Sequence, residues 1–184
     1  MHVIKLGGSL SQADALLHCI NRIEQHYQNR MVVIVPGGGV FAEQVRVAQA
    51  RFQFDDYTAH CMALLAMQQT ALLIKGLMND VQIAHSVHDL KTQLPSQKTL
   101  IWSPEVVELD RAGVPATWAI TSDSLAAWLA KTLQAKELIL VKSAHINPHL
   151  SLQQLAKQHI IDQGFCEMIS GVTFKIRILN HHHF

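Results

Sequence analysis

Four short apolar runs set the strongest limits on how this chain can fold. They lie at residues 3–6, 31–35, 99–102 and 138–141, and they are rich in β-branched side chains. Strands of this composition are typical of a parallel sheet covered by helices on both faces, because neither side of such a strand meets water. The runs therefore predict a mainly parallel central sheet.

Amphipathic segments separate most of these runs. Residues 13–27 carry apolar side chains at intervals of three and four, with polar side chains on the other face, which predicts a surface helix packed on a sheet. Residues 41–52 and 125–133 repeat the spacing, and residues 57–78 read as one long helix. This alternation of strands and helices predicts an α/β fold, a three-layer α/β/α sandwich.

The remaining segments carry weaker signals. Residues 79–98, which include Pro95, are expected to form a short strand and a loop. Residues 151–165 are expected to form a helix and a turn, and alternating apolar and basic residues over 174–179 predict a half-exposed strand. We find no internal repeat, so the 184 residues are expected to form a single domain.

Composition and charge exclude several classes of function. The chain is 49% hydrophobic and 16% charged, which excludes a disordered protein. Fifteen basic residues against fourteen acidic ones give a formal charge of +1, so no overall field would hold the protein on nucleic acid or on an anionic membrane. An anionic ligand must therefore be bound by a local site.

Cysteine usage and the hydrophobic segments bear on location. Cys19, Cys61 and Cys166 are odd in number and widely spaced, which argues against a disulfide framework and a zinc ribbon. The apolar start of the chain is too short for a signal peptide, and polar residues interrupt the most hydrophobic stretch, residues 61–78. We expect a cytoplasmic protein that does not cross a membrane.

A lysine and a glycine turn follow one another at the end of the first predicted strand. Lys5 lies in the last part of that strand, and Gly7, Gly8 and Ser9 come next. Glycines at such a position allow backbone N–H groups to approach an anion closely, and the lysine adds a mobile positive charge. A tight turn explains the same residues without any ligand. Taken alone, this turn leaves both interpretations open.

A second glycine turn follows the second predicted strand. Gly37, Gly38 and Gly39 precede a predicted helix, whose N-terminus favours negative charge, and three successive glycines are poorly explained by a plain turn. With Ala42 they also fit the dinucleotide-binding pattern of a Rossmann fold. That pattern needs an acidic residue at the end of the next strand, and Asp55 leads into a predicted helix instead. The Rossmann interpretation is therefore weakened.

Two further motifs carry hydroxyl and charged side chains. Thr121, Ser122 and Asp123 precede a predicted helix, where an aspartate is a common first-turn residue but can also orient lysines or hold Mg²⁺ beside a phosphate. Lys142 and Ser143 follow the fourth predicted strand, at the edge where α/β sheets bind ligands. Two lysines, two glycine turns and one aspartate suffice for phosphoryl transfer, which depends on positive charge and in-line positioning.

In this order the four motifs resemble the amino acid kinase superfamily over residues 3–143. The resemblance implies ATP and Mg²⁺ as cofactors, and a small-molecule phosphate or carboxylate as acceptor. It implies that Lys5 and Lys142 contact the transferring phosphoryl group and that Asp123 organises them. It implies an acceptor-side half over about residues 1–118 and a shortened nucleotide-side half over about 119–184. A homodimer is compatible with it.

The same resemblance assigns the remaining candidate residues to two groups. The first group is expected at the phosphates of the nucleotide and comprises Gly7, Gly8, Ser9 and Ser143. The second group is expected near the acceptor and comprises Gly37, Gly38, Gly39, Thr121 and Ser122. No residue is assigned to a metal ion.

Residues 118–130, WAITSDSLAAWLA, are most similar to the kinases of methanofuran-type cofactor biosynthesis. That similarity implies an acceptor that is already a phosphomonoester, such as an aminomethylfuran methyl phosphate. Transfer to a phosphate brings two anions together, so the lysines and Mg²⁺ would offset their repulsion. Stacking of Trp118 on a flat acceptor ring is one hypothesis, although an aromatic residue before a helix is more often part of a core.

The chain departs from the superfamily after Ser143. Related kinases continue with Asp-Gly-Val-Tyr, whereas this chain continues with Ala144 and His145 and ends soon after Asn180. We therefore expect altered contacts to ribose and adenine. A second hypothesis follows, that of a non-catalytic or regulatory homologue that binds a nucleotide or an anionic metabolite without transferring phosphate. Consumption of ATP separates the two hypotheses.

Twelve histidines raise the alternative of a metal site. His85 with His88, and His145 with His149, have tolerable spacings, but no Asp, Glu or Cys joins either pair in a ligand-like pattern. Histidines scattered over the surface explain these residues better.

Overall fold

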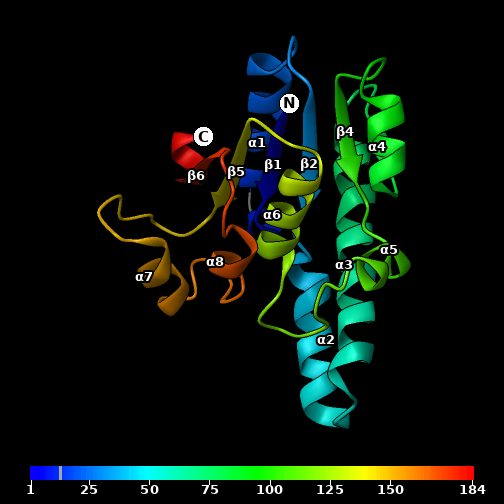
Figure 1. The fold of residues 1–184 in the computed structure, drawn as a ribbon, viewed down its shortest axis with the longest axis vertical. Helices are drawn as coiled ribbons and strands as arrows, with labels where there is room; N and C mark the ends of the chain where they lie inside the picture. The colour runs from blue at the N-terminus through cyan, green and yellow to red at the C-terminus, as the bar shows by residue number, and fades with distance from the viewer. Residues whose placement is uncertain (13) are drawn as a thin grey trace.

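A six-stranded sheet forms the centre of the computed structural model, which describes residues 1–12 and 14–184 (Figure 1). Its order is β3-β4-β2-β1-β5-β6, and every neighbouring pair is parallel. The strands are β1 (His2–Leu6), β2 (Val32–Pro36), β3 (Gln82–Ala84), β4 (Thr99–Trp102), β5 (Glu137–Lys142) and β6 (Lys175–Asn180). The predicted α/β fold with a parallel central sheet is confirmed.

The helices alternate with these strands as the sequence predicts. They are α1 (Ala15–His26), α2 (Gly39–Phe52), α3 (Asp56–Leu77), α4 (Val87–Gln93), α5 (Val106–Arg111), α6 (Ser122–Thr132), α7 (Leu152–Lys157) and α8 (Phe165–Met168), with the 3₁₀ segments η1 (Gly8–Gln12) and η2 (His181–His183). Of the helix predicted over 13–27, Ala13 lies outside the described residues. No helix in the described part of the chain has the length and hydropathy to span a bilayer.

Two apolar layers cover the sheet, one on each face. On one face Val3 and Leu140 pack in a cluster with Leu129 of α6. On the other face Ile4 packs in a second cluster with Ile20 of α1. Because side chains alternate along a strand, each strand contributes to both layers. The apolar side chains of β1, β2, β4 and β5 are buried, whereas those of the edge strand β6 are half-buried. This arrangement is the predicted three-layer sandwich.

Residues 87–93 form a helix where the sequence analysis predicts a loop. The loop prediction is wrong because Ser86 caps the helix: its side chain accepts a hydrogen bond from the N–H of Asp89 at 3.1 Å. Leu90 then anchors the helix in the core, where it is fully buried. The short strand predicted in the same segment is present as β3.

The pair α2 and α3 extends beyond the carboxyl end of the sheet (Figure 1). The apolar spacing over 41–52 does predict a helix, but its expected packing on the sheet is wrong. Val45 is the buried residue of α2, whereas Phe41 and Phe52 are 37% and 68% exposed. The reason is the direction of α2, which leaves the sheet and packs against α3 instead.

The order of the strands places a crevice between β1 and β5. From β1 the chain first builds β2, β3 and β4 on one side, and then crosses to the other side for β5 and β6. Ligands of open parallel sheets bind outside the carboxyl ends of the strands where the order reverses in this way. Leu6 of β1 lies opposite Val141 of β5 at that edge, so Lys5 and Lys142 both reach it.

Candidate functional site

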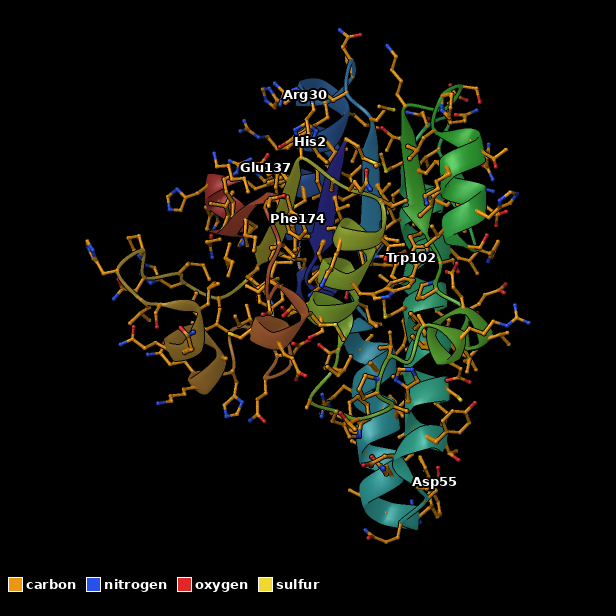
Figure 2. The ribbon with its side chains drawn as sticks, viewed as in Figure 1. His2, Arg30, Asp55, Trp102, Glu137 and Phe174 are labelled. Carbon is orange, nitrogen blue, oxygen red and sulfur yellow. The ribbon has the colours of Figure 1, made fainter. Side chains whose placement is uncertain are left out.

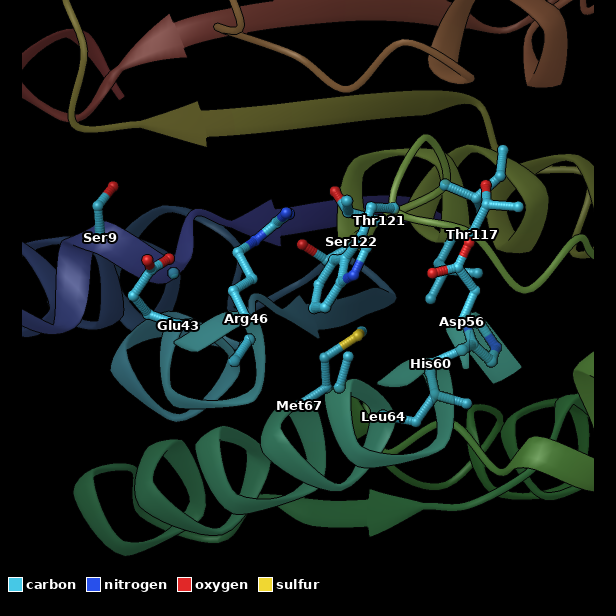
Figure 3. Close-up of a pocket in the computed structure, with 18 residues that line it drawn as sticks. Ser9, Glu43, Arg46, Asp56, His60, Leu64, Met67, Thr117, Thr121 and Ser122 are labelled. Atoms are coloured by element: carbon cyan, nitrogen blue, oxygen red, sulfur yellow. The ribbon is translucent and has the colours of Figure 1, made fainter. Parts of the chain in front are cut away.

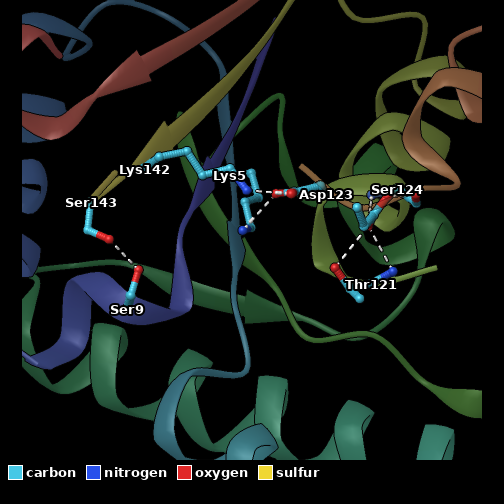
Figure 4. A network of polar contacts seen from close by, with 8 residues as sticks. Lys5, Ser9, Thr121, Asp123, Ser124, Lys142 and Ser143 are labelled. Carbon is cyan, nitrogen blue, oxygen red and sulfur yellow. Dashed lines mark hydrogen bonds and ion pairs between the residues drawn. The ribbon is translucent and has the colours of Figure 1, made fainter. Parts of the chain in front are cut away.

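Lys5, Asp123 and Lys142 form a buried ion cluster at this edge (Figure 4). The Nζ atom of Lys5 lies 2.8 Å from Oδ1 of Asp123, and Lys142 Nζ contacts the other carboxylate oxygen, Oδ2. Lys5 shares its strand face with Val3, and Lys142 shares its strand face with Leu140, so both lysines point toward α6. Asp123 lies in the first turn of that helix and meets them there.

Electrostatics fix the charge state of this cluster. Burial by itself would raise the pKa of Asp123, but the charges of Lys5 and Lys142 outweigh that effect and lower the pKa to about 2. Burial and the charge of Lys5 lower the pKa of Lys142 to about 8, against the opposing pull of Asp123. At neutral pH the aspartate is therefore ionised, and it is a weak base.

Asp162 holds the N-terminus of α6 in place, a role for which sequence reasoning gave no signal. Its carboxylate accepts hydrogen bonds from the N–H and Oγ1 of Thr121 at 2.8 and 2.9 Å, and from the N–H of Ser124 at 3.0 Å. The hydroxyl of Ser124 also donates to it. The N-cap residue Thr121 makes no cap hydrogen bond with its own side chain, so a residue about 40 positions away supplies the cap.

The two glycine turns pack against each other, backbone on backbone. A Cβ on Gly8 would lie 2.3 Å from the N atom of Gly39, and a Cβ on Gly37 would lie 2.4 Å from the N atom of Gly8. Gly39 also has a positive φ of 55°, a conformation that favours glycine. The glycines are therefore required by the close approach of the turns, whatever else they bind.

The backbone amides of two of these glycines have hydrogen-bond partners within the protein. The N–H of Gly7 donates to Val141 O at 2.8 Å, and the N–H of Gly37 donates to Leu6 O at 2.9 Å. Both amides are thus already used within the sheet edge and are not free for a phosphate oxygen. Gly8, Gly38 and Gly39, by contrast, line a pocket.

That pocket has a volume of about 400 Å³ and lies between the glycine turns, α2, α3 and the start of α6 (Figure 3). Its wall is apolar on one side, where Leu64, Met67 and Leu125 contribute side chains. Thr121 and Ser122 line it as well, so the structure brings the candidate acceptor residues together, with the exception of Gly37. We call it the acceptor pocket.

A second cavity of about 450 Å³ adjoins the ion cluster. Lys5, Asp123 and Lys142 line it, together with Asp162 from the segment after α7. We call it the transfer cavity. Its wall is shared with the acceptor pocket at three residues, Arg46, Trp118 and Thr121.

Trp118 is held in this wall by two contacts. Its Nε1–H donates to Oε1 of Gln49 at 2.6 Å, and the guanidinium of Arg46 lies 3.8 Å from the centroid of its ring. The face of the indole under Arg46 is therefore occupied, which leaves that face unavailable for stacking on an acceptor ring. Sequence reasoning missed Arg46; its position two helical turns after Gly39 was the available signal.

Ser9 and Ser143 bridge the loops that follow β1 and β5. Their hydroxyl oxygens lie 2.6 Å apart in a hydrogen bond (Figure 4). The side-chain amide of Asn180 donates to Ser143 O and to Ala144 O, both at 2.9 Å, which ties the end of β6 to the same loop. The two candidate phosphate-binding serines thus lie together at the same edge of the sheet as the ion cluster. In the sequence, Ser9 follows Lys5 by four residues and Ser143 follows Lys142 directly.

Among the described residues, no group of three or more His, Cys, Asp or Glu side chains is placed to hold a metal ion. Asp123 has both carboxylate oxygens directed at lysines. This cluster is therefore not suited to bind magnesium with protein ligands alone. Its two lysines make it suited to bind an anion.

Comparisons with known proteins agree with this geometry. Residues 1–145 match the model of the amino acid kinase family. Over 141 residues the chain is 30% identical to the [5-(aminomethyl)furan-3-yl]methyl phosphate kinase of Methanocaldococcus jannaschii, a match that covers 76% of this chain and 64% of that relative.

Solved structures share the fold at low sequence identity. The uridylate kinase of Archaeoglobus fulgidus superposes with a TM-score of 0.75 at 16% identity, covering 98% of this chain and 91% of that one. The UMP kinase of Bacillus anthracis gives 0.73 at 17% identity, covering 99% and 87%. By its sequence and its fold, this chain belongs to the amino acid kinase family.

Proposed function

We propose that this chain transfers the γ-phosphoryl group of ATP to a small-molecule acceptor. The observation that carries the proposal is the buried cluster of two lysines on one aspartate, open to the transfer cavity and separated from an acceptor-sized pocket by a single wall. Membership of the amino acid kinase family supports it.

The lysines supply the charge that phosphoryl transfer requires. Negative charge gathers on the equatorial oxygens of the transferring group, and ammonium groups placed there in advance stabilise it without reorganisation. Asp123 would keep Lys5 and Lys142 in place before the substrates bind, since it contacts both. Without that carboxylate, two buried positive charges would repel each other.

The carboxylates of the transfer cavity favour an acceptor that is already ionised. Asp123 is paired with two lysines, and Asp162 accepts four hydrogen bonds from the start of α6. Asp123, with its pKa lowered to about 2, is too weak a base to remove a proton from an alcohol. Burial raises the pKa of Asp162, but donors from the start of α6 occupy both of its carboxylate oxygens. A phosphate or carboxylate oxygen attacks without such a base, because it carries its negative charge beforehand.

We further propose a phosphomonoester as the acceptor, of the kind named for the relative from Methanocaldococcus jannaschii, [5-(aminomethyl)furan-3-yl]methyl phosphate. The product is then a diphosphate. With this acceptor, the chain would act in methanofuran-type biosynthesis of a C1 carrier, in the cytoplasm. The similarity of 30% identity to that relative supports the assignment.

ATP would lie on the side of Ser9 and Ser143, with its γ-phosphate in the transfer cavity. Gly8, which lines the acceptor pocket together with Ser9, would approach the phosphate oxygens with its backbone. Magnesium would enter with the nucleotide and be held by phosphate oxygens, where it neutralises charge. The acceptor-side and nucleotide-side halves, about 1–118 and 119–184, would then meet at this cavity.

A binding homologue without catalysis is the second candidate. The altered segment after Ser143, which lacks the Asp-Gly-Val-Tyr sequence of related kinases, favours it. Such a protein would bind ATP or an anionic metabolite but release no ADP.

The proposal is tested by ADP formation from Mg-ATP with a panel of acceptors, in the wild type and in two matched variants. Asp123→Asn removes the shared partner of the lysines, and we expect turnover to fall by about 10²- to 10³-fold. Glu137→Gln is the control: Glu137 is a buried carboxylate that pairs with Arg177 at 2.8 Å at the other end of β5 (Figure 2).

We expect Glu137→Gln to lower stability while turnover stays near that of the wild type. Normal turnover in Asp123→Asn would contradict the assigned role of the cluster. ATP binding with no ADP from any acceptor would favour the binding homologue.

A further inference from the structure

Arg46 lies where the two cavities meet. It follows Gly39 by seven residues on α2, so both lie on one face of that helix, two turns apart. Gly39, Glu43 and Arg46 all line the acceptor pocket, and of these Arg46 alone also lines the transfer cavity. Its guanidinium is therefore close to the path between an acceptor and the transferring phosphoryl group.

The guanidinium is held in this place by a chain of contacts. It stacks on the indole of Trp118, whose Nε1–H donates to Gln49 Oε1. The amide of Gln49 donates in turn to Asp56 Oδ1 at 2.9 Å and to Phe54 O at 3.2 Å. Stacking covers one face of a guanidinium but leaves the N–H groups at its edge free to donate.

Arg46 carries a positive charge that takes part in none of the ion pairs between described residues. The other titratable side chains around the acceptor pocket are Glu43, Asp56 and His60. Arg46 is thus the one permanent cation among the described residues of that pocket, and the carboxylates on α2 and α3 would repel an anion from the rest of it.

We propose that Arg46 binds the phosphate of the acceptor and so selects a phosphomonoester over the corresponding alcohol. The inference rests on the proposed function, and it names the Arg46 guanidinium as the group that determines which class of acceptor is bound. A guanidinium binds a phosphate through two parallel N–H donors, and both hydrogen bonds are strengthened by the opposite charges. A neutral hydroxyl offers one oxygen and no charge, so it gains much less from the same guanidinium. Trp118 and Gln49 are positioning residues, because they act through Arg46.

The transfer step balances without any proton acceptor. An oxygen of the acceptor phosphate forms a bond to the γ-phosphorus of ATP, and the bond from that phosphorus to the β,γ-bridging oxygen breaks. The bridging oxygen keeps the electron pair and leaves with ADP, and the acceptor becomes a diphosphate. Arg46 offsets the repulsion between the two phosphates as they approach.

Binding calorimetry with two ligands tests the inference apart from catalysis. The ligands are [5-(aminomethyl)furan-3-yl]methyl phosphate and its unphosphorylated alcohol. In Arg46→Gln we expect the Kd of the phosphomonoester to rise by about 10- to 100-fold, since one charge-assisted pair is lost. The Kd of the alcohol should change by less than about threefold. The preference for the phosphomonoester, given by the ratio of the alcohol Kd to the phosphomonoester Kd, should therefore fall steeply.

Arg51→Gln is the matched control. Arg51 lies on the same helix and stacks on Phe52 at 5.2 Å, but it lines neither cavity. We expect both dissociation constants to stay at wild-type values in this variant. Gln49→Leu should lower the preference for the phosphomonoester, measured as the ratio of the alcohol Kd to the phosphomonoester Kd, by less than Arg46→Gln does. The reason is that this variant loosens Trp118 without removing the guanidinium.

The outcomes separate this inference from the proposed function. An unchanged phosphomonoester Kd in Arg46→Gln, an equal rise for both ligands, or no binding of the phosphomonoester to the wild type would each overturn it. Phosphomonoester binding that depends on Arg46 in a protein that releases no ADP would support the inference and refute phosphoryl transfer.

Discussion

Lys142 makes the candidate site sensitive to alkaline pH. Its pKa of about 8 lies below the ordinary lysine value of 10.5, chiefly because it is buried and then because Lys5 is close. The charged form exists below that pKa, so positive charge leaves the site as the pH rises through 8. We predict that kcat/KM falls above about pH 8, because that ratio reports groups of the free enzyme.

Lys142→Arg provides the control for this pH dependence. A guanidinium keeps its charge throughout the accessible range, so the decline above pH 8 should disappear even if the maximal rate is lower. For kcat, we expect bound phosphates to raise the pKa of Lys142, because their negative charge favours the ammonium form, and so to shift the decline to higher pH. A kcat/KM profile of Lys142→Arg that falls as steeply as that of the wild type would show that another group controls it.

Contacts between residues far apart in the sequence could not be predicted from the sequence alone. Lys5, Asp123 and Lys142 could be predicted, because each lies at the boundary of a clear strand or helix. Asp162 could not, because its hydrogen bonds to Thr121 and Ser124 depend on where a short, weakly patterned segment folds back. The same limit explains the amides of Gly7 and Gly37, which form hydrogen bonds at the sheet edge.

At the scale of elements, the two glycine turns pack closely against each other. Gly8→Ala would place a Cβ 2.3 Å from the N atom of Gly39, and backbone must move to relieve the contact. We predict a loss of about 1–3 kcal/mol in the free energy of unfolding, measured in urea, together with weaker acceptor binding. Gly76→Ala is the control, because a Cβ there meets nothing within 4 Å.

Gly76 lies in the last turn of α3, where alanine is still the better helix former but the gain is smaller than in a helix interior. We therefore expect Gly76→Ala to raise the free energy of unfolding by at most about 0.5 kcal/mol and to leave acceptor binding unchanged. Equal stability of Gly8→Ala and the wild type would contradict the close packing of the turns.

The elements themselves were largely predictable, and the exceptions have physical causes. Periodicity identified α1, α3 and α6, and β-branched runs identified four of the strands. The helix α4 was missed because its apolar periodicity is weak. The cap by Ser86 and the burial of Leu90 stabilise the helix nonetheless. The exposure of α2 was missed because periodicity shows that a helix is amphipathic, not what covers its apolar face.

For the whole molecule, the exposed stripe of α3 bears on assembly. Leu65, Leu72, Leu73 and Leu77 follow helical spacing on one side of α3, and each is at least 40% exposed. Apolar stripes of this kind on a surface helix mark interaction sites. We propose a second copy of the chain as the partner, because a homodimer is compatible with the family resemblance.

Light scattering after size exclusion tests the homodimer. The wild type should elute with twice the mass of the 20.5 kDa chain, and the double variant Leu65→Glu, Leu72→Glu should elute as a monomer that retains its helical circular dichroism. A wild type that remains monomeric at high concentration would contradict the proposal.

Transfer of label from [γ-³²P]ATP to the acceptor is the most direct test of the central claim, that the Lys5, Asp123 and Lys142 cluster passes a phosphoryl group between the two cavities. With [5-(aminomethyl)furan-3-yl]methyl phosphate present, the account predicts one labelled diphosphate for each ADP formed, and no labelled product in Lys5→Met. Label released as inorganic phosphate, or transferred as well by Lys5→Met as by the wild type, would contradict it.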